Sequence, residues 1–96
     1  MAFYVYILKC ADGSYYTGHT EKLENRVAAH QEGQIPGYTE RRRPIKLAFA
    51  EELPSREDAI ARERQIKGWS RAKKEALIRR DWQALAELSK ARQNLV

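Results

Sequence analysis

Two ionisable side chains stand where a helical pattern calls for apolar ones. Leu23, Val27 and His30 follow one another at helical spacing within the segment 21–31. Arg26 lies three residues after Leu23 and four before His30, so it is expected to share their face. An arginine and a histidine are therefore predicted to point with the core stripe of this helix, away from solvent.

A carboxylate has a similar position in a later helix. Glu63 lies four residues after Ala59 and three before Ile66, in the middle of an otherwise apolar stripe. A buried charge needs a partner or a metal ion. One explanation is a structural ion pair between Arg26 and Glu63, although buried ion pairs add little net stability.

Two tyrosines complete the set of groups that could do chemistry. A three-residue hairpin loop with Gly13 in the left-handed conformation would place Tyr6 and Tyr16 on one face of a sheet. A two-residue turn at Asp12 and Gly13 would place them on opposite faces. Phenols, a guanidinium, an imidazole and a carboxylate are then expected to converge on one side of a small sheet, and each of these groups has a use in phosphodiester chemistry. Core packing of the tyrosines and a hydrogen-bonded core histidine are the alternatives.

The strands that must position these groups form a small sheet. Residues 3–8 are almost continuously aromatic and aliphatic, which predicts a central strand covered on both faces. Residues 14–17 predict a second strand, ended by Gly18, and 46–53 predict a third. The fold class is therefore α+β, an α/β sandwich with a three-stranded, mostly antiparallel sheet.

Four helices are expected around the sheet, in the order β-β-α-β-α-α-α. The first covers 21–31 and ends at Gly33. The second starts in a capping box formed by Ser55 and Asp58. The other boundaries are set by capping residues and by glycine: Gly68 ends the second helix, Ser70 begins the third and Asp81 begins the fourth. The fourth helix carries the apolar stripe Trp82, Leu85 and Leu88.

Composition limits the chain to one small domain. Its 96 residues are 43% hydrophobic, which is enough for one compact core. The longest apolar run, 2–8, falls far short of the ~20 residues that span a bilayer. We expect neither a membrane segment nor a secretory signal, and hence a cytoplasmic location. Cys10 has no disulfide partner, no Cys/His spacing suggests zinc, and this cysteine is expected to fill the core.

The charge of the chain favours a polyanionic partner. The net charge is +5 and the isoelectric point is about 9.6, values typical of nucleic-acid-binding domains. The loop 34–44 carries three consecutive arginines and Tyr38, which could stack on a base. A solvated cationic surface and a turn-packing aromatic are the alternatives. The candidate phosphate contacts are Arg41, Arg42, Arg43, Lys46, Lys67, Arg71, Lys73 and Lys74.

Taken together, these residues resemble the GIY-YIG nuclease superfamily, and most closely its small stand-alone bacterial members. Tyr4-Val5-Tyr6 and Tyr16-Thr17-Gly18 are similar to the paired triplets of that name. Residues 23–30 resemble the first-helix signature, in which an arginine precedes a histidine by one turn, and 59–67 resemble the metal-binding helix. The resemblance spans roughly residues 3–78. It implies a GIY-YIG domain at 1–80, followed by a C-terminal helix at 81–96 that packs on or extends it.

The resemblance implies metal-dependent hydrolysis of a phosphodiester bond. Glu63 would be the only protein carboxylate on one Mg²⁺ or Mn²⁺ ion, bound weakly without substrate. Arg26 would bind the scissile phosphate. Tyr6 is the candidate general base, with Tyr16 holding water or phosphate, and His30 is the alternative that takes or relays the proton.

The same resemblance implies nucleic acid, most simply DNA in repair or recombination, as the partner. Candidate contacts include Gly18 and His19, the latter at a position that is lysine in some catalytic members. A catalytically weak binding module that acts with a protein partner is the alternative function. A third hypothesis makes the last helix an interaction surface for another protein or a second copy of the chain.

Overall fold

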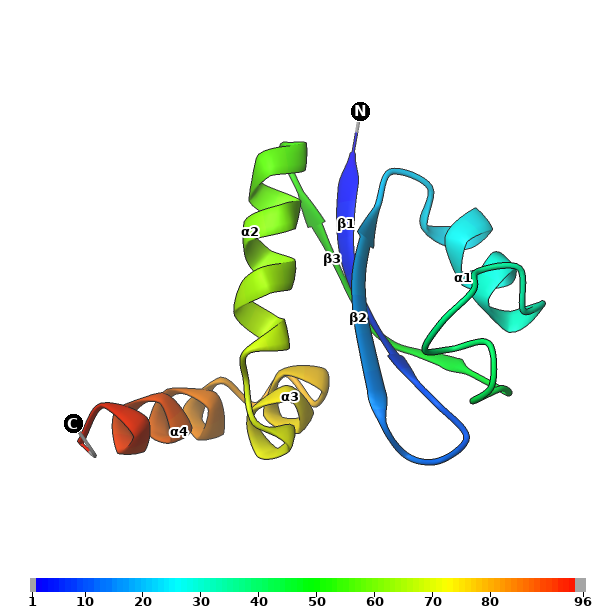
Figure 1. Cartoon of the computed structure of the whole chain (residues 1–96). Coiled ribbons are helices and arrows are strands. Elements are labelled where there is room, and N and C mark those ends of the chain that lie inside the picture. Colours follow the sequence, from blue (N-terminus) through cyan, green and yellow to red (C-terminus); the bar gives the residue numbers. More distant parts are fainter. Residues whose placement is uncertain (1, 95–96) are drawn as a thin grey trace.

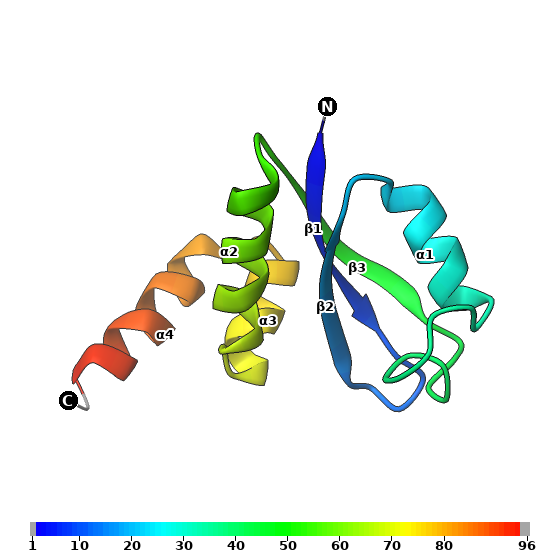
Figure 2. The same cartoon turned by 45° about the horizontal axis from the view of Figure 1, so that its top comes forward.

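A three-stranded antiparallel sheet lies between helices in the computed structural model, which describes residues 2–94. Figures 1 and 2 show α1 on one face of the sheet and α2 on the other, with α4 extending away from the sheet. The elements are β1 (Phe3–Lys9), β2 (Tyr15–Thr20), α1 (Leu23–Gln31), β3 (Lys46–Leu53), α2 (Arg56–Lys67), α3 (Arg71–Ile78) and α4 (Trp82–Asn94). The predicted fold class and element order are confirmed. None of the described helices is long and apolar enough to cross a membrane.

The strand order β2-β1-β3 places β1 in the centre and leaves β2 at one edge. The hairpin loop has three residues, because the Cys10 amide donates to the Ser14 carbonyl across it, and Gly13 has a left-handed φ of 85°. This loop length sets a register that pairs Tyr6 with Gly18 and places Tyr16 on the Tyr6 face. β2 does not end at Gly18 as predicted, because its pairing with β1 continues to Thr20.

Each face of the sheet has its own core. On the α2 face, Val5 and Ile7 pack with Phe49, Ile66 and Leu77. The alternation of side chains along a strand sends the intervening residues to the opposite face. There, the buried cluster packs against α1 and consists of Tyr6, Leu8, Cys10 and Ile45. Cys10 is buried as predicted, although it follows the last residue of β1.

The sequence prediction for α1 is wrong at one important position. Leu23, Val27 and His30 face the sheet, as predicted, and His30 is buried. Arg26 is exposed instead of sharing their face. The residues that face the sheet are spaced by four and then three positions. Arg26 directly precedes Val27, and one residue of an α-helix turns by about 100°, so the Arg26 side chain lies on the flank of the helix.

Side-chain caps begin the last three helices where the sequence predicts them. Ser55 accepts the Asp58 amide, and Ser70 accepts the Lys73 amide. The carboxylate of Asp81 accepts the Ala84 amide. On α4 the predicted stripe is only partly buried. Leu85 packs against the core on the α2 face, whereas Trp82 stays 56% exposed. Leu88 is half-buried.

The core on the α2 face gives a direct test of this packing. Ile66 is fully buried, so Ile66→Ala should lower the free energy of unfolding by about 2–5 kcal/mol through lost burial and the cavity left behind. Leu47 is exposed on β3, and Leu47→Ala should change it by no more than about 0.5 kcal/mol. Urea denaturation of both variants measures the difference; equal losses would contradict the packing described.

Candidate active site over the edge strand

A buried phenol, imidazole and hydroxyl form a hydrogen-bonded chain on the α1 face. The Tyr6 hydroxyl lies 3.0 Å from His30 Nε2, and His30 Nδ1 lies 2.7 Å from Thr39 Oγ1. The exposed fractions of the three residues are 1%, 1% and 2%. β1, α1 and the loop before β3 thus each supply one member of the chain.

The surroundings keep Tyr6 and His30 neutral near pH 7. Burial raises the pKa of Tyr6 well above its usual value, and the neighbouring Tyr16 and Glu63 add to this while Arg26 opposes it. Burial also lowers the pKa of His30, and the Arg26 charge lowers it further. A free phenolate at Tyr6 is therefore disfavoured. A neutral imidazole beside it is the group able to accept its proton.

Tyr16 extends this chain into an aromatic cluster that reaches the surface. Its ring centroid lies 6.4 Å from that of Tyr6 and 5.0 Å from that of His30. On the outer side Tyr16 stacks on Tyr38, at 6.1 Å. The guanidinium carbon of Arg42 lies 3.9 Å from the centre of the Tyr38 ring. A base stacking on the covered face of Tyr38 would therefore have to displace Arg42.

Glu63 lies on the other side of the sheet from the tyrosines. It projects from α2, where Oε1 is 2.6 Å from His19 Nδ1 and Oε2 is 2.8 Å from Lys67 Nζ. Its side chain is only 16% exposed. Burial raises the pKa of this carboxyl, but the hydrogen bonds and charges of Lys67 and His19 outweigh it and hold the pKa below its usual value. Glu63 is therefore ionised at neutral pH.

One prediction about Glu63, and the alternative offered for it, need correction. The ionisable groups do not converge on one face, because α2 covers the Val5 face of the sheet while α1 covers the Tyr6 face (Figure 1). Nor does Glu63 pair with Arg26, since its partners are His19 and Lys67. Glu63 does lie on α2, as predicted, with its side chain largely buried. The side of the sheet is set by the path of the chain between β3 and α2, which periodicity does not encode.

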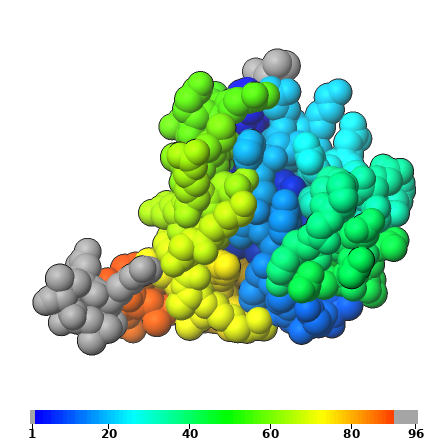
Figure 3. Space-filling view, in the orientation of Figure 1, coloured from blue at the N-terminus to red at the C-terminus, as the bar shows by residue number. Residues whose placement is uncertain are grey.

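The two sets of groups approach each other over the edge strand β2. A Cβ atom added at Gly18 would lie 2.5 Å from the Tyr6 hydroxyl oxygen, so the missing side chain lets Tyr6 reach toward the sheet edge. From there Tyr6 is close enough to Glu63 and Arg26 for both charges to shift its pKa. Figure 3 shows the surface hollowed between α2 and the loop 34–44, along β2.

Arg26 lines a cleft next to this site. The cleft has a volume of about 560 Å³ and is bounded by the end of β2, α1 and the start of α2. His19, Lys22 and Arg56 also line it. Three basic side chains, those of Lys22, Arg26 and Arg56, outnumber the one acidic lining residue, Glu21, which lies 3.6 Å from Arg56. The cleft therefore favours an anionic ligand such as a phosphate. Arg26 is exposed and lines this cleft, so a ligand from solvent can reach its guanidinium.

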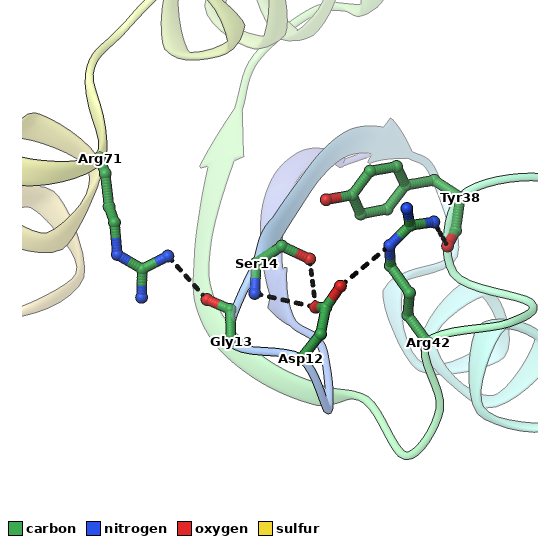
Figure 4. A network of polar contacts seen from close by, with 6 residues as sticks. All are labelled: Asp12, Gly13, Ser14, Tyr38, Arg42 and Arg71. Carbon is green, nitrogen blue, oxygen red and sulfur yellow. Dashed lines mark hydrogen bonds and ion pairs between the residues drawn. The ribbon is translucent and has the colours of Figure 1, made fainter.

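Arginines hold the hairpin turn from two sides (Figure 4). Arg42 Nε donates to Asp12 at 3.1 Å and Nη1 donates to the Tyr38 carbonyl at 2.8 Å. From the opposite side Arg71 Nη1 donates to the Gly13 carbonyl at 2.8 Å. Both predicted phosphate contacts therefore also carry structural hydrogen bonds, and each uses only part of its guanidinium in them.

The other predicted phosphate contacts differ in their surroundings. Arg43 Nε donates to the Glu40 carbonyl at 3.0 Å, and Lys73 Nζ lies 4.5 Å from the centre of the Trp69 ring. Lys67 forms an ion pair with Glu63. The remaining members are Arg41 and Lys46, which are exposed, and Lys74, which is half-buried.

Sequence reasoning missed two contacts that shape the site. Thr39 lies in an irregular loop, where no periodicity marks a buried residue, and nothing in the sequence pointed to its hydrogen bond with His30. His19, predicted as a nucleic-acid contact, also lies against Glu63, and this second contact was not predicted. The alternation along β2 could have found this second contact, because His19 pairs with Val5 and so faces α2.

Comparisons with known proteins agree on one family. A family model described as the GIY-YIG catalytic domain matches residues 2–76. A UPF0213 protein of Natronomonas pharaonis is 48% identical over 78% of this chain and 88% of its own length, and one of Staphylococcus saprophyticus is 45% identical over 78% and 92%. The solution structure of a UPF0213 protein from Bacillus halodurans is 44% identical, with a TM-score of 0.53 over 81% of this chain and 83% of that one. A solution structure from E. faecalis is 33% identical, with a TM-score of 0.58 over 82% and 84%.

The approach of Tyr6 to Gly18 can be tested by adding one methyl group. Gly18→Ala should lower the free energy of unfolding by about 1–3 kcal/mol, because the new Cβ overlaps the buried phenol. Gly68→Ala is the matched control, since the nearest atom to its Cβ would be 3.6 Å away. Urea denaturation compares the two. If Gly18→Ala were as stable as the control, the close approach would be ruled out.

Acid should destabilise the protein through His30. Its pKa in the folded protein lies below the value of about 6.5 in an unfolded chain. As pH falls below about 6.5, the unfolded state binds a proton that the folded state does not, so stability decreases until the folded pKa is reached. Urea denaturation at about pH 8 and about pH 5.5 should show this loss. His30→Gln should lose less unfolding free energy than the wild type between these two pH values. If the variant lost as much as the wild type, the effect would belong to other groups.

Proposed function

Because the chain belongs to the GIY-YIG catalytic domain family, we propose that it is an endonuclease that hydrolyses phosphodiester bonds in DNA with the help of one divalent metal ion. The observation that carries this proposal is the approach, over the edge strand β2, of a buried phenol–imidazole pair and an ionised carboxylate. The phenol–imidazole pair can move a proton, and the carboxylate can hold a cation. Phosphodiester hydrolysis needs both.

Glu63 is the residue that would hold the metal ion. Its carboxylate is ionised, and Mg²⁺ in nucleic-acid enzymes is commonly bound through one or two carboxylates together with substrate phosphate. Within the described residues, no group of three or more potential acidic, histidine or cysteine ligands gathers at one place, which fits weak binding without substrate. Lys67 occupies Oε2 and would have to move aside. When bound, Mg²⁺ or Mn²⁺ would neutralise charge on the phosphate under attack.

We place the proton transfer on Tyr6 and His30. The attacking water gives a proton to Tyr6 Oη while the phenolic proton moves to His30 Nε2, so that no free phenolate forms. The resulting hydroxide attacks phosphorus, the bond to the leaving oxygen breaks, and solvent protonates that oxygen. His30, which starts neutral, ends as imidazolium and then returns its proton to solvent, which balances the proton that solvent gave to the leaving oxygen. This route keeps Tyr6 as the group that contacts water and uses the imidazole as the final acceptor.

Cationic and polar groups around the site would bind the substrate. Arg26 offers paired donors to the scissile phosphate from the rim of its cleft, and Tyr16 lies beside the Tyr6 ring, where its hydroxyl could hold water or phosphate. Phosphates further along the strand would meet β2, the end of α2, the basic loop and α3. The residues proposed for these contacts are Gly18, His19, Tyr38, Arg41, Arg42, Arg43, Lys67 and Lys74.

The proposed activity is tested by cleavage with matched variants. Wild-type protein incubated with plasmid and branched DNA should cut in the presence of Mg²⁺ or Mn²⁺ and should not cut with chelator. Glu63→Ala should abolish cutting through loss of the metal. Tyr6→Phe, folded as judged by urea denaturation, should lower the rate by roughly 10²-fold or more while DNA binding in a gel-shift assay changes little.

The same experiment distinguishes a nuclease from a binding module. DNA binding that is equal in wild type and Glu63→Ala, with no cutting under any metal, would support a clamp that acts with a protein partner. Cutting by Tyr6→Phe at the wild-type rate would assign the base elsewhere. Retained cleavage in Glu63→Ala would remove Glu63 from the metal site.

A further inference from the structure

The Thr39 hydroxyl is the far end of the buried chain that begins at Tyr6. It comes from the loop 34–44, is 2% exposed and lies 2.7 Å from His30 Nδ1. It contacts the imidazole nitrogen opposite the one that faces Tyr6, so its hydrogen bond is coupled to which of the two nitrogens carries the proton. We propose that Thr39 is a positioning residue that holds His30 as the Nδ1–H tautomer, leaving Nε2 free to accept the Tyr6 proton. Its role in cleavage rests on the proposed function.

The protons of the hydrogen-bonded chain can be arranged in only two ways. Tyr6, neutral His30 and Thr39 each carry one proton on these polar atoms, but only two hydrogen bonds link them. One proton is therefore left outside the chain, at one end or the other. Either Tyr6 donates to Nε2 and Nδ1–H donates to Thr39, or Thr39 donates to Nδ1 and Nε2–H donates to Tyr6.

The relative strengths of the donors favour the first arrangement. A phenol is a much stronger hydrogen-bond donor than an aliphatic hydroxyl, and an imidazole nitrogen is the strongest acceptor in the chain. The first arrangement joins these two groups and leaves unpaired the weaker donor, the Thr39 hydroxyl. The second places the Tyr6 proton outside the chain and so gives up the phenol–imidazole hydrogen bond in a residue that is only 1% exposed.

The arrangement decides what Tyr6 can do. In the first, the phenolic proton faces the lone pair of Nε2, so a water proton can enter at Oη as the phenolic proton leaves. In the second, Nε2 is already protonated and the transfer from Tyr6 is blocked. A residue from the loop that carries the basic triplet thus sets the direction of proton movement at the site.

Nitrogen-15 NMR of histidine-labelled protein tests the assignment directly. The chain has two histidines, and a His19→Asn variant identifies the His30 signals. In wild type at neutral pH, we expect His30 Nδ1 at the shift of a protonated nitrogen and Nε2 at that of an unprotonated one. The reverse pattern in the wild-type protein would overturn the proposal without the need for any Thr39 variant.

Two substitutions at Thr39 test the consequence. Thr39→Val removes the hydroxyl at similar size, and the loss of the Nδ1–H acceptor should move His30 toward the Nε2–H tautomer and lower the cleavage rate by roughly 10²-fold. Thr39→Ser keeps the hydroxyl and should restore both the NMR signature and most of the rate. An unchanged tautomer in a folded Thr39→Val protein, or a failure of Thr39→Ser to restore it, contradicts the proposal.

The two readouts separate this inference from the proposed function. The tautomer is measured on the protein alone, without metal or nucleic acid. If wild type shows the expected tautomer and Thr39→Val shifts it, but no DNA is cut with any metal, the assignment of Thr39 stands and the proposed nuclease activity is overturned.

Discussion

The arrangement of the site depends on how closely Tyr6 approaches the backbone of Gly18. The tyrosine lies on the central strand, which is buried on both faces, and its hydroxyl can reach the sheet edge only because β2 has no side chain at the position opposite. The sheet otherwise separates the α1 layer from the α2 layer. With a side chain at Gly18, the phenol and the carboxylate of Glu63 would belong to two unconnected surfaces.

This geometry separates neutral from charged groups. On the α1 side, burial keeps Tyr6 and His30 uncharged, which suits proton transfer between them. On the α2 side, His19 and Lys67 keep the Glu63 carboxylate charged, which suits a cation. A single well-solvated cavity would not impose such different conditions on groups this close, because water screens charges and stabilises ionised forms alike. The sheet supplies two environments at one edge.

The elements of the fold follow from the sequence more readily than the site does. Strand alternation, caps such as Ser55 and the left-handed position of Gly13 are local signals, and each was confirmed. The exposure of Arg26 was not predicted, because spacings of three and four residues place a side chain near a stripe without saying on which flank. The burial of Thr39 was not predicted because it depends on where a loop lies in space, and the loop has no repeating pattern.

The three-residue hairpin loop has a consequence for how this family can vary. Removing or adding one residue at the turn would shift the pairing by one step and move every side chain of β2 to the opposite face of the sheet. Tyr16 would then face α2, and His19 would face α1. A change of two residues would preserve sidedness and only slide the strand. Length variation at this turn should therefore be found in even steps among functional relatives, whatever the amino acids at its tip.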